Sequence, residues 1–210
     1  MLDEISEAVL AREDVLKYPR EQVSAYLEEL RTTQRHKFYR ALQHPLYPIL
    51  RKIERKHENL HYVTAAVRQH RIVYASNHKS HTDYLVEPLV LDDNGIRPPL
   101  IAAGINLFGG PLGLIHKHVT GAIPIRRATK DAAYLIIFKA YVAEVLKKHD
   151  LFFYPEGGRS YSGEMKQAKT GLYNAILGSD HPGRRRVRSR PRGSHPGAPG
   201  GQEAPAAVRA

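Results

Sequence analysis

The 210-residue sequence contains no cysteine, which excludes disulfides, thiolate nucleophiles and cysteine-ligated zinc and is typical of a reducing compartment. It also lacks an apolar run of about 20 residues, so we expect no membrane-spanning helix. Acidic residues, and not a basic and apolar leader, follow Met1, and we therefore expect no secretory signal. An apolar fraction of 42% is still enough to build the core of one sizeable domain.

Acidic residues are too few to balance the basic ones, and the net charge is +11. Seven arginines against Asp180 and Glu203 give +5 to residues 179–210, and residues 1–178 share the remaining +6. This balance favours an anionic partner, which is nucleic acid, a phospholipid surface or a phosphorylated substrate. The alternative is a basic surface that only keeps the protein in solution.

The chain is predicted to divide into three parts. Residues 1–58 form an N-terminal helical region, because apolar residues recur at helical spacing (Leu2, Ile5, Val9, Leu10 and Leu16, then Val23, Tyr26, Leu27 and Leu30, then Leu50 and Ile53). Such apolar faces pack against a core or, alternatively, dock on a membrane. Residues 59–178 form an α/β domain, and residues 179–210 form a disordered tail of arginine, proline, glycine and alanine.

Within residues 59–178, short apolar runs alternate with helical patterns. The runs of strand length are 72–75, 100–102, 122–125 and 151–154, and the clearest helical pattern covers 129–149. This alternation predicts an α/β fold with a central mixed sheet flanked by helices. Pro124 counts against the middle of a paired strand, because proline suits an edge or an end of a strand better.

The stretch Tyr74–Val86 allows two interpretations. Ser80 and Asp83 match the S-x-x-D capping box, in which the carboxylate satisfies a backbone amide at the start of a helix. The second interpretation pairs Asp83 with His78, provided that His78 lies in the turn before the helix. Asp83 would then orient the imidazole and leave its other nitrogen free to act as a general base.

Two further segments offer cations next to strand ends. A glycine turn with Arg159, followed by Lys166 and Lys169, comes after the last strand and suits a phosphate. The segment lacks both P-loop and G-x-S-x-G spacing, so a nucleotide-binding loop and a hydrolase elbow are not indicated.

Two adjacent arginines end the segment 121–127, where solvent exposure is the simpler interpretation. The segment 116–118 has two histidines but no partner at metal-ligand spacing, so we expect no zinc.

As an ordered set these segments resemble the glycerolipid acyltransferase family, in its glycerol-3-phosphate (or dihydroxyacetone-phosphate) acyltransferase branch. The family's H-x-S-x-x-D block corresponds to 78–83, its middle blocks to "IAAGINL" and "GAIPIRR", and its third block to "YPEGGRSYSG". The resemblance covers roughly residues 70–177, about half of the chain. It favours the His78–Asp83 pair over capping alone, although Asp83 can serve both roles.

The resemblance implies an enzyme of phospholipid biosynthesis that moves an acyl group from acyl-CoA or acyl carrier protein to glycerol 3-phosphate. His78 and Asp83 would be catalytic, without a covalent acyl-enzyme. The implied acceptor-binding residues are Arg126, Glu156, Gly157, Arg159 and Ser160. No metal or cofactor is expected besides the thioester co-substrate. A lipid product implies peripheral contact with an anionic membrane surface, at the cytoplasmic face, and we expect no specific nucleic-acid partner.

The sequence departs from the family pattern in two places. Tyr161 stands where this branch commonly has another basic residue. The family's fourth block, a proline-containing apolar strand, has no counterpart after Gly178, and we expect a truncated or frame-shifted end. This departure leaves open a relative that binds phosphorylated lipid precursors or a membrane surface without turnover. Nucleic-acid binding through the arginine tail is a third hypothesis.

Overall fold

The computed structural model describes residues 2–35, 58–80, 83–109 and 120–179, together with scattered residues between 37 and 56. The predicted tail from residue 180 onward lies outside the described residues. Three other parts also lie outside them: most of 36–51, the histidines of 116–118, and residues 81 and 82 of the H-x-S-x-x-D block. Among the described ranges, no helix combines the length and the apolar character needed to cross a bilayer.

A four-stranded parallel sheet forms the centre of the molecule. Its strands are β1 (Val73–Ala75), β2 (Leu100–Gly104), β3 (Ala122–Ile125) and β4 (Leu151–Phe153), in the order β1-β4-β2-β3. The α/β class predicted from the sequence is confirmed. In the described part of the chain, the antiparallel component of the expected mixed sheet is an isolated bridge between Gln34 and Thr120.

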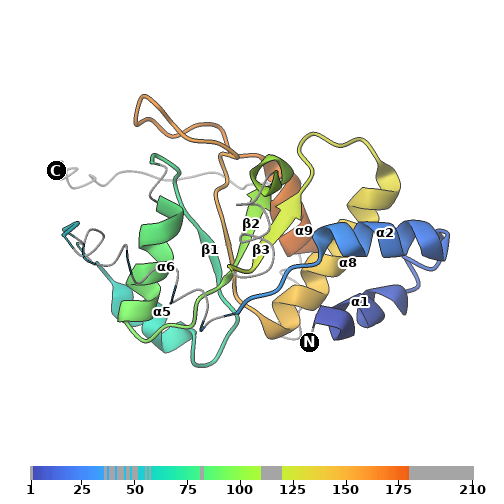
Figure 1. Cartoon of the computed structure of the whole chain (residues 1–210), viewed down its shortest axis with the longest axis horizontal. Coiled ribbons are helices and arrows are strands. Elements are labelled where there is room, and N and C mark those ends of the chain that lie inside the picture. The colour runs from blue at the N-terminus through green and yellow to red at the C-terminus, as the bar shows by residue number, and fades with distance from the viewer. Residues whose placement is uncertain are drawn as a thin grey trace, which may run out of the picture.

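Helices lie on both sides of the strands. They are α1 (Leu2–Leu10), α2 (Arg20–Leu30), α5 (Leu60–Ala66), α6 (Asp83–Asp93), the 3₁₀ helix η2 (Ile105–Phe108), α8 (Ala132–Lys148) and α9 (Thr170–Gly178). Figure 1 shows α5 and α6 to one side of the strands, and α8, α9 and the two N-terminal helices to the other. The predicted helix at 129–149 is confirmed with slightly narrower bounds.

The apolar faces of α1 and α2 pack on α8. One buried cluster joins these two helices to the inner residues of α8 and to the sheet. The helices contribute Ile5, Val9, Val23, Leu27 and Leu30, and the sheet contributes Leu100, Ile123 and Leu151. The core-facing interpretation of these helices is thus confirmed. Leu16, predicted on the same apolar face as Ile5 and Val9, is 66% exposed and Val15 is buried instead. The reason is that α1 ends at Leu10, so the following turns break the helical spacing.

The order of the strands explains the unusual proline. Among the described strands, β3 pairs with β2 alone and so lies at an edge of the sheet. Proline has no backbone N–H to donate to a neighbouring strand, and an edge strand tolerates this loss. Parallel strands of this kind place their carboxyl ends, and the loops that follow them, at one end of the sheet, where open α/β folds bind ligands. The loops after β1, β3 and β4 are those that carry the predicted site residues.

Candidate active site

The first and third sequence blocks meet at the carboxyl ends of β1 and β4, which are neighbours in the sheet. The backbone N–H of Ser76 donates to the carbonyl of Phe153 at 3.2 Å, which extends the pairing by one step. Beyond it, the N–H of Ser160 donates to the carbonyl of His78 at 2.8 Å. The glycine turn that carries Arg159 is therefore joined directly to the loop that carries the histidine.

Asp83 fulfils both roles that the sequence suggested for it. Its Oδ2 lies 3.1 Å from His78 Nδ1 and also accepts the backbone N–H groups of Lys79 and Ser80, each at 2.8 Å. The last of these bonds is the back-bond of a capping box at the start of α6. Because Nδ1 is held by the carboxylate, Nε2 is the imidazole nitrogen that can exchange a proton with a ligand.

The environment of Asp83 favours its charged form. Burial of the carboxylate opposes ionisation, but hydrogen bonds from the Ser80 amide, the His78 ring and the Lys79 amide outweigh it and lower the pKa of Asp83. The carboxylate therefore stays negative and can stabilise a positive imidazolium next to it.

An aromatic ring lies under the imidazole. The rings of His78 and Tyr154 stack with centroids 4.0 Å apart and planes inclined by 17°. The Tyr154 hydroxyl donates to Glu87 Oε2 at 2.9 Å, and the Ser76 hydroxyl donates to Glu87 Oε1 at 2.6 Å. Burial raises the pKa of Glu87 against these two hydrogen bonds, and the negative charge of Asp83 adds to the rise. Glu87 thus fixes the ring on which His78 rests.

Sequence reasoning missed Tyr154 and Glu87. A signal for Glu87 was present, because it follows Asp83 by four residues and so lies on the same face of α6. A signal for Tyr154 was its position at the end of the strand next to β1. Neither residue belongs to a motif whose spacing announces a stacked pair.

The glycine turn after β4 is built around one buried carboxylate. Glu156 is 5% exposed, and its Oε2 accepts the backbone N–H of Lys166 at 3.1 Å. Gly157 has a φ of +64°, and a Cβ there would lie 2.8 Å from the Cδ of Lys169. Arg159 follows at the surface, donates to the Tyr161 hydroxyl at 2.8 Å and lies over its ring. Ser160 is 4% exposed and so belongs to the framework of the turn.

Arg126 lies at the other edge of the sheet, directly after β3. Its Nε and Nη2 form a two-pronged ion pair with Glu29 of α2, at 2.7 and 2.5 Å. Its guanidinium also lies 5.0 and 4.9 Å from the ring centroids of Tyr26 and Tyr134. The hydrogen bonds to Glu29 raise the pKa of Arg126 further above its usual range. The structure thus brings His78, Asp83 and Arg159 together and pairs Arg126 internally.

The neighbouring arginine is the more accessible of the two. Arg127 is exposed, and its side chain covers Gly104 at the end of β2, where an added Cβ would lie 2.5 Å from Arg127 Nε. The absence of a side chain at Gly104 lets this guanidinium lie across the carboxyl end of the sheet. The sequence showed two adjacent arginines here, but only the structure separates their roles.

The described residues contain no group of three histidine or acidic side chains close enough to hold a metal ion. The cluster itself consists of an imidazole held by a carboxylate, with the cations of Arg159 and Arg127 at the same end of the sheet. An arrangement of this kind can deprotonate a hydroxyl and bind an anionic substituent of the same molecule.

Comparison with known proteins gives a consistent result. The family model described as Acyltransferase matches residues 54–182. A glycerol-3-phosphate acyltransferase of Histophilus somni (strain 129Pt) is 43% identical over 114 residues, which are 53% of this chain and 14% of that protein. One of Glaesserella parasuis serovar 5 (strain SH0165) is 34% identical over 186 residues, which are 82% of this chain and 23% of that protein. The chain thus spans less than a quarter of these relatives.

Proposed function

Because the chain belongs to the acyltransferase family, we propose that it transfers a fatty acyl group from a thioester to the hydroxyl of glycerol 3-phosphate. The donor would be acyl-CoA or acyl carrier protein, and dihydroxyacetone phosphate is the nearest alternative acceptor. The observation that carries the proposal is the His78–Asp83 pair, joined through the Ser160 amide to the turn that bears Arg159. The names of the two relatives support the choice of acceptor.

The proposed reaction is a direct transfer without an acyl-enzyme. His78 Nε2 takes the proton of the acceptor hydroxyl while the oxygen attacks the thioester carbonyl. The tetrahedral intermediate then collapses, the carbon–sulfur bond breaks, and the imidazolium returns the proton to the thiolate that leaves. Asp83 stabilises the imidazolium between these steps, and Tyr154 keeps the ring from rotating by stacking on it.

The acceptor phosphate is assigned to the arginines at this end of the sheet. Arg159 precedes Ser160, whose amide is bonded to the histidine loop, and its planar guanidinium suits two phosphate oxygens. Arg127 offers a second cation at the end of β2. Arg126 can take part only if it leaves Glu29. Glu156, Gly157 and Ser160 shape the turn, and Glu156 does so through the Lys166 amide.

Contact with an anionic membrane surface is part of the proposal, because the product carries an acyl chain and the net charge is +11. We place this contact at the cytoplasmic face. No cofactor is proposed beyond the thioester itself.

An acceptor comparison tests the function. Purified protein is supplied with palmitoyl-CoA and with glycerol 3-phosphate, dihydroxyacetone phosphate or glycerol, and acylated product is quantified. We expect product with a phosphorylated acceptor and little with glycerol. Arg159→Gln should raise KM for the phosphorylated acceptor, whereas Arg20→Gln, the same charge change on the exposed start of α2, should not. Acceptor binding without turnover in the wild-type protein would refute the proposal and favour a non-catalytic binder.

A further inference from the structure

A small open hollow lies at the end of the sheet opposite the candidate active site. It has a volume of about 230 Å³ and is lined by Val67, Arg68, Gln69, His70, Arg71 and Arg97. Residues 67–71 join α5 to β1, and Arg97 precedes β2, so both segments enter the sheet at the amino ends of its strands. His78 and Arg159 follow the carboxyl ends, so the length of a strand separates the two places, roughly 10 Å or more at 3.3 Å per residue.

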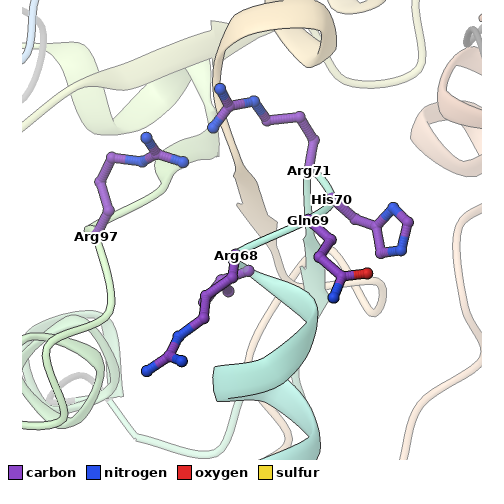
Figure 2. A pocket seen from close by; sticks show the side chains of 6 residues that line it. Arg68, Gln69, His70, Arg71 and Arg97 are labelled. Carbon is purple, nitrogen blue, oxygen red and sulfur yellow. The ribbon is translucent and has the colours of Figure 1, made fainter.

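Two guanidinium groups converge on the hollow without enough negative charge to balance them. Figure 2 shows the side chains of Arg71 and Arg97 pointing toward one another, while Arg68 points away from them. Arg97 reaches Asp150 at 3.3 Å, but the other oxygen of this buried carboxylate accepts the Ile72 amide at 2.9 Å. In the part of the chain that the structure describes, Arg71 has no ion pair. Like charges that converge in this way repel one another unless an anion lies between them.

Two buried polar atoms nearby strengthen the case. The hydroxyl of Tyr74 and Nε2 of His149 are buried and have no hydrogen-bond partner among the described residues. The pKa of His149 is lowered by its burial and, next, by the positive charges of Arg71 and Arg97, so this ring senses the charge of the two arginines. This end of the sheet therefore holds buried polar atoms without partners and carries a local positive potential.

We propose that the hollow between the end of α5 and the loop before β2 is a second anion site, which binds a phosphate group between Arg71 and Arg97. Guanidinium groups suit phosphate because their paired N–H donors match two of its oxygens. The hollow is smaller than the roughly 300–1,000 Å³ of pockets that hold a drug-sized molecule. It therefore fits one phosphate group and part of its substituent, either on a soluble ester or on the headgroup of an anionic phospholipid.

Nuclear magnetic resonance of the histidine rings locates binding directly. Inorganic phosphate is titrated at fixed ionic strength, with chloride as the matched salt, while the pKa of His149 is followed. Phosphate between the two arginines should raise the pKa of His149, because it offsets the positive charge that lowers it. A response of His78 alone would place the phosphate at the active-site end and overturn the proposal.

Variants separate a specific site from a general basic surface. Arg71→Gln should weaken phosphate binding at His149 by about tenfold or more, as expected for the loss of charge-assisted hydrogen bonds. Arg20→Gln, which removes the same charge far from the hollow in sequence, should leave it unchanged. Arg71 is the better probe because Arg97 also holds Asp150 in the fold. Equal binding in Arg71→Gln and Arg20→Gln would refute the site.

A vesicle arm identifies the source of the phosphate. Sedimentation with phosphatidylcholine vesicles, with and without phosphatidylglycerol, compares the wild type with the same two variants. A larger loss in Arg71→Gln than in Arg20→Gln assigns the site to a lipid headgroup. If both variants lose vesicle binding equally, and phosphate still raises the pKa of His149 in the wild type, the site binds a soluble phosphate ester. Equal losses of vesicle binding without that rise in the pKa of His149 contradict the proposal.

Discussion

Replacing Asp83 by asparagine removes one negative charge beside the His78 imidazole and keeps an oxygen at the same place. The two side chains are 21 and 18% exposed, so their interaction is only partly screened by water. A hydrogen bond to a charged group contributes about 1.5–3 kcal/mol. If Asp83 stabilises the imidazolium of the transition state, Asp83→Asn should slow acyl transfer by roughly 10- to 150-fold.

The same substitution has a predictable effect on stability. Loss of the charged acceptor for Ser80 and Lys79 should lower the free energy of unfolding by about 1 kcal/mol, as for other helix caps. Folding lowers the pKa of Asp83, so this stabilisation is complete above the ordinary carboxyl pKa of about 4 and is lost as the pH falls through the lower folded value. Wild type and variant should therefore differ at neutral pH and converge in acid.

A double-mutant cycle separates the catalytic effect from the structural one. Initial rates of palmitoyl transfer are measured for wild type, Asp83→Asn, His78→Ala and the double variant, and thermal unfolding of each is followed by circular dichroism. If Asp83 acts through the histidine, its substitution should have little further effect once His78 is gone. A full rate in Asp83→Asn, or an equal loss in the His78→Ala background, would refute the reasoning.

Three other substitutions test the glycine turn, the buried Glu87 and the ion pair of Arg126. Gly157→Ala should lower the free energy of unfolding by about 1–2 kcal/mol because φ is +64°, whereas Gly158→Ala, with open space around it, should have a smaller effect in the same urea titration. Glu87→Gln should raise the melting temperature at neutral pH, since burial raises the pKa of Glu87 and disfavours its charge, and the gain should shrink as the pH falls and Glu87 protonates. Glu29→Gln should release Arg126 and lower KM for glycerol 3-phosphate; an unchanged KM would limit Arg126 to a structural role.

The strands and the main helix were predictable because their patterns are local. The apolar run at 122–125 coincides with β3, which lies at an edge of the described sheet, a position that suits Pro124. Leu16 was misplaced for a local reason as well, because spacing alone does not show that α1 stops at Leu10. Pairing between strands depends on residues far apart in the chain, so the parallel register was not available from the sequence.

The candidate site was predictable only in part. The five-residue spacing of His78 and Asp83 allowed their contact, which the structure shows at 3.1 Å. The partner of Arg126 was beyond reach, because Glu29 belongs to an N-terminal helix with no motif of its own. Tyr154 was equally hidden, since its stacking on His78 requires β1 and β4 to be neighbours. Long-range partners of this kind decide which of the predicted cations remain available to a ligand.

The rate of acyl transfer in His78→Ala tests the central claim most directly. Palmitoyl transfer to glycerol 3-phosphate should be about 10²- to 10⁴-fold slower in this variant, because that factor is the usual contribution of a general base. His61→Ala, at an exposed position in α5, is the matched control and should keep the wild-type rate. Thermal unfolding of both variants excludes loss of the fold as the cause. A rate in His78→Ala equal to that of the wild type would contradict the account.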